Sequence, residues 1–343
     1  MSKRILLTGS GGFCGSHVLR HIMINTDWEV ICPVTFRHRG NGDRIASAIE
    51  ANPKWHDRIH IFLCDLSAPI SDTTRIRFGQ VDEIWNIASS SHVDRSITDP
   101  VPFIQNNVNL ILYLLEYAKV VKPKLFLQMS TDEVMGPAPV GYNHKEWEPS
   151  LPSNPYSASK AAQEAVCISY WRTYEVPIII TCTMNLIGEM QDTEKFLPMI
   201  ISKLTKGEPV PVHVSPEGAS GSGFYLHARN LASAWMYLSQ NHSPQMYPTF
   251  DRPSRFNIVG EKEVTNEGMV ELVASALKVE PLMEKVNFHS SRPGHDLRYA
   301  LDGSAIAKLG WKATVSLEDS IRKTVEWSLR HPEWLGERES DKK

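Results

Sequence analysis

Short apolar runs alternate with longer amphipathic stretches along the first half of the chain. Residues 3–8, with the run Ile5-Leu6-Leu7, predict a buried strand, and residues 16–25 continue with apolar positions at helical spacing. A long apolar helix is predicted over residues 101–118. Strands that alternate with helices favour an α/β fold with a doubly wound parallel sheet, in which ligands bind at the carboxyl ends of the strands. Further strands are predicted over residues 29–34, 59–64, 83–88, 125–129 and 177–183.

A glycine-rich turn separates the first predicted strand from the first predicted helix. Gly9, Gly12 and Gly15 stand three residues apart in this turn. Glycine lets the backbone turn tightly and approach a pyrophosphate closely, and the N-terminus of the following helix favours negative charge. Between a strand and a helix, the three glycines predict a dinucleotide site rather than an ordinary tight turn. The expected cofactor contacts also include Phe13, Leu66 and Ala88.

The residues after the second predicted strand leave the kind of dinucleotide open. An acid there would bind the adenosine ribose of NAD, whereas arginine accommodates the 2′-phosphate of NADP. No acid is present, and Arg37 and Arg39 follow the strand. They predict either a 2′-phosphate clamp or a solvated cationic loop, so the cofactor is NAD or NADP. Asp65, directly after the third predicted strand, is placed to bind the adenine amino group or to cap the next turn.

The alternation of strands and helices weakens after about residue 185. Prolines become frequent, and residues 217–223 are small and turn-forming. We predict a dinucleotide-binding domain over residues 1–185, with later returns such as 224–260, and a mostly substrate-binding, smaller lobe over residues 186–343. Phe256-Asn257-Ile258 is the expected return to the sheet. Helices are predicted in this half over residues 196–206, 231–240, 266–277 and 317–330.

A tyrosine and a lysine four residues apart supply the groups for hydride transfer. Tyr156 and Lys160 begin and end the run Tyr-Ser-Ala-Ser-Lys. Residues four apart share one face of a helix. We therefore expect the Lys160 ammonium to lower the pKa of the Tyr156 phenol, which then accepts a proton from an alcohol as hydride leaves. An exposed helical pair is the alternative interpretation of the same spacing.

A hydroxyl and two adjacent carboxylates end the fifth predicted strand. Thr131 is expected to hydrogen-bond the reacting hydroxyl, and Asp132 and Glu133 point in different directions, so that one acts as acid and the other as base. Two such acids can instead cap a helix. Together with Tyr156, they predict that water is eliminated next to the oxidised carbon.

Bulk composition narrows the class of protein. The chain has 343 residues, of which 42% are hydrophobic and 22% charged, as in ordinary globular proteins. A net charge of −3 provides no electrostatic argument for nucleic acid or an anionic membrane as partner. The sequence shows no long apolar run and no cleavage site, so we expect a cytoplasmic protein. Five scattered cysteines predict reduced core thiols rather than disulfides or a metal site: Cys14, Cys32, Cys64, Cys167 and Cys182.

These motifs resemble those of the extended short-chain dehydrogenase/reductase family, and within it the nucleotide-sugar 4,6-dehydratases, particularly of the dTDP-glucose type. Residues 130–134 match the dehydratase signature, and residues 156–160 match the dehydrogenase motif. Residues 89–96 resemble the segment beside the nicotinamide, and residues 194–198 and 292–296 resemble motifs of the substrate lobe. The resemblance covers nearly the whole chain and implies a Rossmann-type sheet, a nucleotide-sugar substrate and a tightly held cofactor.

The resemblance also implies a three-step reaction. Tyr156, with Lys160 and Thr131, removes the C4 hydroxyl proton while hydride passes to the nicotinamide. Glu133 then takes the C5 proton and Asp132 protonates the departing C6 hydroxyl. Return of the hydride to C6 gives a 4-keto-6-deoxy sugar nucleotide. The residues expected to contact the substrate are Ser91, Asn185, Lys195 and Arg292.

Three positions depart from the family pattern and leave other functions open. Met135 replaces a usual tyrosine, Ser90 an expected acid, and Ser222 an expected arginine. A sugar-nucleotide 4-epimerase or decarboxylase, which would use only the tyrosine, lysine and threonine, is one alternative. A non-catalytic dinucleotide-sensing protein is another.

The resemblance further implies a homodimer. In the family, pairing involves the helices that correspond to residues 101–118 and 157–174, and both are apolar here. Burial against the chain's own sheet would explain much of the same pattern.

Overall fold

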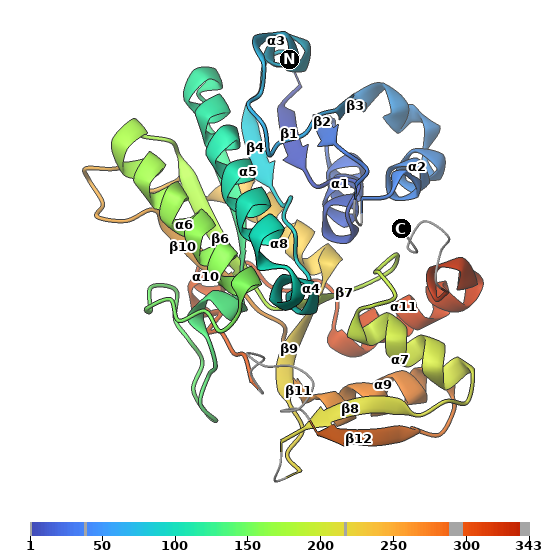
Figure 1. Ribbon diagram of the computed structural model, residues 1–343. Coiled ribbons are helices and arrows are strands. Elements are labelled where there is room, and N and C mark those ends of the chain that lie inside the picture. Colours follow the sequence, from blue (N-terminus) through green and yellow to red (C-terminus); the bar gives the residue numbers. More distant parts are fainter. Residues whose placement is uncertain (1, 38–39, 216–217, 288–297, 337–343) are drawn as a thin grey trace.

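A seven-stranded parallel sheet forms the centre of the larger part of the molecule (Figure 1). The computed structural model describes residues 2–37, 40–215, 218–287 and 298–336. The strands lie in the order β10-β6-β5-β4-β1-β2-β3, and every neighbouring pair is parallel. The predicted doubly wound sheet is therefore confirmed. The strands are β1 (Arg4–Thr8), β2 (Glu29–Val34), β3 (Ile59–Leu63), β4 (Glu83–Asn86), β5 (Leu125–Thr131), β6 (Ile178–Thr183) and β10 (Ser254–Ile258).

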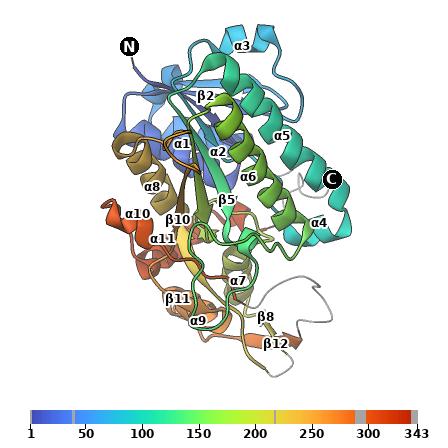
Figure 2. The same ribbon diagram turned by 90° about the vertical axis from the view of Figure 1, so that its left-hand side faces the viewer.

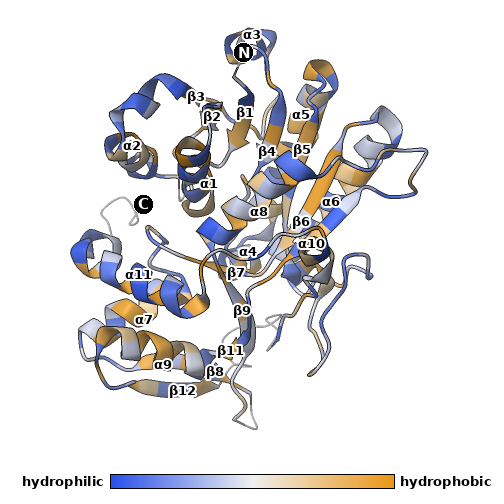
Figure 3. Cartoon of the chain, turned by 180° about the vertical axis from the view of Figure 1, so that it is seen from behind, coloured by the Kyte–Doolittle hydropathy of each residue, from blue (hydrophilic) through white to orange (hydrophobic). Residues whose placement is uncertain are grey.

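Helices cover both faces of this sheet because alternate strand residues are apolar in both directions. Ile5 and Leu7 of β1 pack with one hydrophobic cluster, whereas Leu6 packs with another on the opposite face. Figure 2 shows α5 and α6 on one side of β5 and α8 on the other, and Figure 3 shows the hydrophobic colouring of the central strands. The helices of this part are α1 (Phe13–Asn25), α2 (Gly42–Ala51), η1 (Pro53–Arg58), α3 (Asp72–Phe78), α4 (Val93–Thr98), α5 (Pro100–Val121), η2 (Asp132–Met135), α6 (Pro155–Tyr174) and α8 (Ala228–Asn241).

Two smaller sheets and their helices form the rest of the structure, in the lower part of Figure 1. One sheet has the order β11-β9-β7 and the other pairs β12 with β8. A separate hydrophobic cluster, which includes Ile200, Val270 and Ile321, joins their helices. The elements are β7 (Asn185–Ile187), α7 (Phe196–Thr205), β8 (Val210–Val214), β9 (Ser222–His227), β11 (Glu263–Thr265), α9 (Asn266–Leu277), β12 (Met283–Asn287), α11 (Leu317–Arg330) and η3 (Pro332–Trp334). The short α10 (Ser304–Lys308) packs instead on β10 of the large sheet.

Tertiary contacts explain where predicted and observed elements differ. β4 ends at Asn86 rather than residue 88, because the backbone N–H groups of Ile87 and Ala88 both donate to Thr8 Oγ1. β5 continues to Thr131, because Ser130 and Thr131 still pair with β6. The extension places the threonine at the carboxyl end of a central strand.

Residues 224–260, expected to return to the dinucleotide-binding domain, contribute to both parts of the structure. β10 pairs with β6, and α8 packs on α1. β9 instead pairs with β7 and β11, outside the seven-stranded sheet. No helix in the described ranges combines the length and apolar character needed to cross a membrane.

Candidate active site

A cleft of about 990 Å³ runs along the carboxyl ends of the large sheet and is closed on the other side by β7, α7 and β8. The reversal of strand order between β1 and β4 is the usual place for a ligand in such sheets. Arg39 and Arg292 lie outside the described residues. All the other predicted site residues line this one cleft: Gly9, Gly12, Phe13, Gly15, Arg37, Asp65, Leu66, Ala88, Ser91, Thr131, Asp132, Glu133, Tyr156, Lys160, Asn185 and Lys195.

The glycine turn after β1 has the shape of a dinucleotide cradle. A Cβ on Gly9, whose φ is +73°, would lie 3.0 Å from Ala88 N, and a Cβ on Gly15 would lie 2.0 Å from Gly9 O. The N-cap of α1, Gly12, has no side-chain cap. First-turn N–H groups therefore need an acceptor from outside the helix, which the oxygens of a pyrophosphate supply. These residues fit the dinucleotide predicted from the sequence.

Arg37 and Asp65 form an ion pair across the ends of β2 and β3. Asp65 Oδ1 also accepts hydrogen bonds from Ser67 N at 3.0 Å and Ser67 Oγ at 2.7 Å. Asp65 therefore caps the turn that follows β3, which was one of its two predicted roles. The guanidinium of Arg37 lies at the edge of the cleft, where it is about half exposed.

The catalytic candidates come from the end of β5 and the start of α6. Thr131 is the last residue of β5, and Asp132 and Glu133 open η2. Thr131 Oγ1 donates to Asp132 Oδ1 at 2.9 Å. Asn154, the N-cap of α6, donates through Nδ2 to Glu133 Oε2 at 3.1 Å and so ties this carboxylate to the helix that carries Tyr156. The sequence analysis missed Asn154, although Asn before Pro is a recognisable start of a helix.

Asp132 differs from its neighbouring carboxylate, Glu133, in that it is buried. Burial, and then the charge of Glu133, raise the pKa of Asp132 to about 7. Asp132 Oδ2 has no hydrogen-bond partner within the described residues. A carboxyl group in this state holds a proton near neutral pH and can donate it, as the acid of an elimination must.

The predicted effect of Lys160 on Tyr156 is wrong for the arrangement observed. Burial, and then the charges of Glu133 and Asp132, raise the pKa of the Tyr156 phenol. The Lys160 ammonium donates instead to Met129 O at 2.8 Å and to Gln163 Oε1 at 2.6 Å. Burial lowers the pKa of Lys160 to about 8. Helical spacing placed both residues in the cleft, but the lysine reaches the backbone of β5 rather than the phenol.

A row of buried polar side chains connects Lys160 to the dinucleotide turn. Thr8 Oγ1 donates to Asn86 Oδ1 at 2.6 Å, and Asn86 Nδ2 donates to Gln128 Oε1 at 2.8 Å. Gln128 Nε2 then donates to Gln163 Oε1 at 3.2 Å, the atom that also accepts from Lys160. Sequence reasoning missed this row. The sequence feature that could have indicated it is the presence of amide side chains inside strands that are otherwise apolar, because buried polar groups need hydrogen-bond partners.

The substrate side of the cleft is built around the start of α7. Lys195 is the N-cap residue of α7, and its ammonium lies 3.5 Å from Ser91 O. Glu194 belongs to the motif at residues 194–198 but was not among the predicted site residues. It accepts from Arg95 Nη2 at 2.7 Å and joins α4 to this segment. Asn185 is exposed at the start of β7.

Two of the three departures from the family pattern have structural explanations. Met135 is buried in a hydrophobic cluster with Cys182 and Tyr299, so its change affects packing rather than the lining of the cleft. Ser222 lines the cleft, and its hydroxyl donates to Glu263 Oε1 at 2.6 Å. Nothing in the structure explains the serine at position 90.

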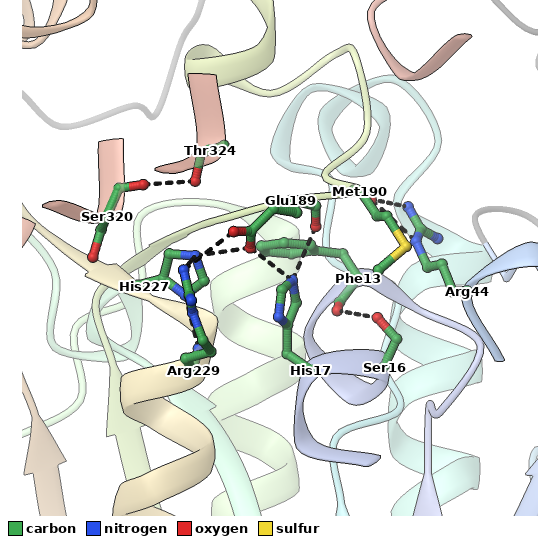
Figure 4. A network of polar contacts seen from close by, with 10 residues as sticks. All are labelled: Phe13, Ser16, His17, Arg44, Glu189, Met190, His227, Arg229, Ser320 and Thr324. Atoms are coloured by element: carbon green, nitrogen blue, oxygen red, sulfur yellow. Dashed lines mark hydrogen bonds and ion pairs between the residues drawn. The ribbon is translucent and has the colours of Figure 1, made fainter. Parts of the chain in front are cut away.

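In the described part of the chain, one cluster has the composition of a metal site. His17, Glu189 and His227 present ligand atoms within 4.8 Å of one another (Figure 4). The carboxylate is already neutralised, since Arg229 Nη2 lies 3.1 Å from Glu189 Oε1. Both histidine rings also make hydrogen bonds with Glu189.

Comparison with known proteins places this cleft among those of sugar-nucleotide enzymes. A family model described as GDP-mannose 4,6 dehydratase matches residues 6–324. The dTDP-glucose 4,6-dehydratase of Salmonella typhimurium is 33% identical over 363 residues, which cover 97% of this chain and 94% of that protein. The dTDP-glucose 4,6-dehydratase 1 of Escherichia coli is 32% identical, with the same coverage.

Solved structures give the same fold. A dTDP-glucose 4,6-dehydratase from Streptomyces venezuelae, solved with NAD bound, superposes with a TM-score of 0.83 at 29% identity and covers 96% of this chain and 98% of its own. A UDP-glucuronic acid 4-epimerase from Bacillus cereus reaches 0.84 at 19% identity, with 96% and 99% coverage. At that low identity, the epimerase shares the fold and no more.

Proposed function

The chain belongs to the GDP-mannose 4,6-dehydratase family, and on this premise we propose that it is a nucleotide-sugar 4,6-dehydratase that uses NAD or NADP. Its substrate is an NDP-hexose of the dTDP- or UDP-glucose kind, and its product is the NDP-4-keto-6-deoxyhexose. The observation that carries the proposal is the buried Asp132, next to Glu133 and in the same cleft as Tyr156.

The chain's own residues divide the proton transfers among them. Tyr156 takes the proton of the C4 hydroxyl, to which Thr131 hydrogen-bonds. Glu133 takes the C5 proton, which the neighbouring ketone has made acidic, and Asp132 gives its proton to the departing C6 hydroxyl. The dinucleotide, held at Gly9, Gly12 and Gly15, supplies hydride exchange with C4 and C6 when it is bound.

The pKa of Asp132 favours this division of roles, whereas the pKa of Tyr156 favours it only when a positive charge lies nearby. Asp132, with a pKa raised to about 7, holds the proton that the leaving hydroxyl needs. Burial, and then the charges of Glu133 and Asp132, raise the pKa of Tyr156, so the phenol needs a compensating positive charge before it can accept the substrate proton as a phenolate. An oxidised dinucleotide held at the glycine turn would supply such a charge.

Incubation with dTDP-, UDP-, GDP- and CDP-hexoses tests the proposal. Formation of the 4-keto-6-deoxy product, followed by mass spectrometry, is the expected result for at least one of them. Inversion at C4 with the C6 hydroxyl retained would show that the enzyme is an epimerase. Bound dinucleotide without turnover of any substrate would favour the sensing protein. Mass spectrometry of the cofactor released on denaturation decides between NAD and NADP.

Glu133→Gln separates elimination from oxidation. The amide cannot take the C5 proton, so 4-keto-6-deoxy product should fall on the order of a hundredfold or more while the cofactor stays bound. Reduced cofactor, which absorbs near 340 nm, should accumulate on addition of substrate. Normal product formation by Glu133→Gln would assign the base to another residue.

We also propose a homodimer that pairs through the outer faces of α5 and α6. Ile111 and Leu115 are fully buried against the chain's own sheet and do not support the interface. Val101 and Ile104 are exposed on α5, and Ala165 is exposed on α6. The mass in solution tests the pairing, and a monomer would overturn it.

The cellular location and the division of the chain are proposals as well. We propose a cytoplasmic location, where the five free cysteines stay reduced. We propose that residues 1–185 hold the dinucleotide and that residues 186–343 mostly hold the substrate. Cell fractionation tests the location, and limited proteolysis between the two parts tests the division.

A further inference from the structure

The segment between β7 and α7, residues 188–195, forms one wall of the cleft and is anchored from behind by polar and charged side chains (Figure 4). Its cleft side carries Gln191, Asp192 and Lys195. On its other side, His17 of α1 donates through Nε2 to Glu189 O at 2.9 Å. The segment therefore lies between the cleft and the helix that follows the dinucleotide turn.

The Glu189 side chain holds this segment to α8. Arg229 N donates to His227 Nδ1 at 2.9 Å, so the proton of this ring is on Nε2, which donates to Glu189 Oε2 at 3.0 Å. Burial lowers the pKa of His17 to about 4 and also lowers the pKa of His227. Both rings are therefore neutral near pH 7. Arg229 provides the positive charge that the Glu189 carboxylate requires.

Arg44 of α2 connects the same segment to the dinucleotide turn. Its side chain is only 1% exposed. The guanidinium donates through Nε and Nη2 to Met190 O, at 3.1 and 2.8 Å, and through Nη2 to Asp192 Oδ1 at 3.0 Å. Nη1 donates to Gly11 O at 3.3 Å, within the glycine turn. One buried group thus contacts both the cofactor side and the substrate side of the cleft.

The backbone that Arg44 holds is in an uncommon conformation. Met190 has a φ of +60°, in the left-handed region that residues other than glycine rarely adopt. Such a conformation persists only where surrounding contacts impose it. The two donors on Met190 O are contacts of this kind. The ring of Trp334 also faces the guanidinium, at 5.1 Å from its carbon to the ring centroid, which fixes the arginine from the side of the C-terminal η3.

We propose that Arg44 is a positioning residue that couples the two halves of the site. It holds residues 190–192 against the glycine turn, so that Lys195 and the dinucleotide are placed in fixed register for hydride transfer. Only the part of this inference that concerns substrate binding rests on the proposed function. Without the two hydrogen bonds from the Arg44 guanidinium to Met190 O, Met190 can relax to an ordinary φ. The start of α7 then moves relative to the cofactor.

Arg44→Met, compared with Arg58→Met, tests this coupling in the holoenzyme. Arg58 is a matched control, since it also donates to three backbone carbonyls, Met23 O at 3.0 Å, Thr26 O at 2.7 Å and Trp28 O at 3.3 Å, and does not line the cleft. For Arg44→Met we expect a rise in KM for the sugar nucleotide on the order of ten- to a hundredfold, larger than the fall in kcat. We also expect faster loss of dinucleotide during gel filtration. Arg58→Met should lower the thermal midpoint and change neither quantity.

The proposal would be overturned if Arg44→Met and Arg58→Met had the same KM and the same cofactor retention. Should Arg44→Met fail to fold, Arg44→Lys is the second variant, since it keeps the charge but loses the paired donors of the guanidinium. KM and the rate of dinucleotide loss should then shift in the same directions, but less far. Unchanged values in Arg44→Lys would also overturn the proposal. If the wild-type protein converts no sugar nucleotide, the proposed function fails, and cofactor retention by the variants still decides whether Arg44 supports the turn.

Discussion

The two sides of the cleft position their functional groups by different means. On the catalytic side, Thr131 ends a central strand and Tyr156 begins a long helix, and both elements pack into the seven-stranded sheet. On the substrate side, Lys195 and Asp192 lie on a connecting segment that is held by Arg44 and by the Glu189 cluster. Regular elements thus place the reacting groups, whereas polar and charged side chains from distant helices place the segment that carries Lys195, which we propose binds the substrate.

This difference suggests which changes each side tolerates. The backbone positions of Thr131 and Tyr156 follow from the hydrogen bonds of a strand and a helix, which side-chain substitutions leave intact. The substrate side depends on individual side chains, so single substitutions there should move the segment and change binding. The variants below compare the two sides in order of expected effect.

Tyr156→Phe should show the largest effect, on the catalytic side. Loss of the phenol removes the group that takes the C4 proton, and kcat should fall by roughly 10²- to 10⁴-fold. Steady-state assay of 4-keto product measures it. Tyr170→Phe is the matched control on the same helix, since Tyr170 bonds Glu116 away from the cleft and its loss should leave kcat near the wild-type value. Equal losses in both variants would mean that the helix, not the phenol, is affected.

Lys195→Met should act on binding more than on chemistry. We propose that Lys195 binds the diphosphate, and removal of such a charged donor costs about 1.5–3 kcal/mol, which is a rise in KM of about tenfold or more, with kcat within a few-fold. Lys203→Met on the same helix is the control, because Lys203 pairs with Glu208 outside the cleft. A fall in kcat with an unchanged KM would place Lys195 on the catalytic side of the comparison.

The pH dependence of kcat should report Asp132. Its pKa is raised to about 7 by burial and Glu133, and its protonated form is the acid. Activity should therefore fall as pH rises through about 7, by about tenfold for each further unit. Asp132→Asn should lower the rate and remove this limb of the profile. A limb that persists in Asp132→Asn would belong to another group.

Gln163→Leu should give the smallest change in rate. The substitution leaves Lys160 bonded to Met129 O but removes Gln163 Oε1, which also accepts from Gln128. Loss of a partner from a buried polar row costs about 1–3 kcal/mol of stability, and kcat should fall only a few-fold. Urea unfolding and initial rates measure the two effects. An unchanged unfolding free energy would show that the row contributes little to the sheet.

Much of the site could be predicted because its groups lie at strand ends that hydrophobic periodicity locates. The apolar runs before Gly9, Asp65 and Thr131 defined three parallel strands, and such strands meet at one edge of a sheet. The predicted residues at the ends of these strands line the same cleft for this reason. The predicted apolar strand stopped at residue 129, because Ser130 and Thr131 have polar side chains. Pairing with β6 extends the observed strand through both residues.

The sequence by itself determined the parallel sheet, the dinucleotide turn and the set of acid, base and phenol, because each depends on short-range pattern and spacing. Only the tertiary structure decided the partner of Lys160, the opposite pKa shifts of Tyr156 and Lys160, and the bridge from Arg44 to Gly11 and Met190. These features depend on burial and on atoms contributed by distant parts of the chain. Local spacing carries no information about either, since burial and partners exist only once the chain has packed.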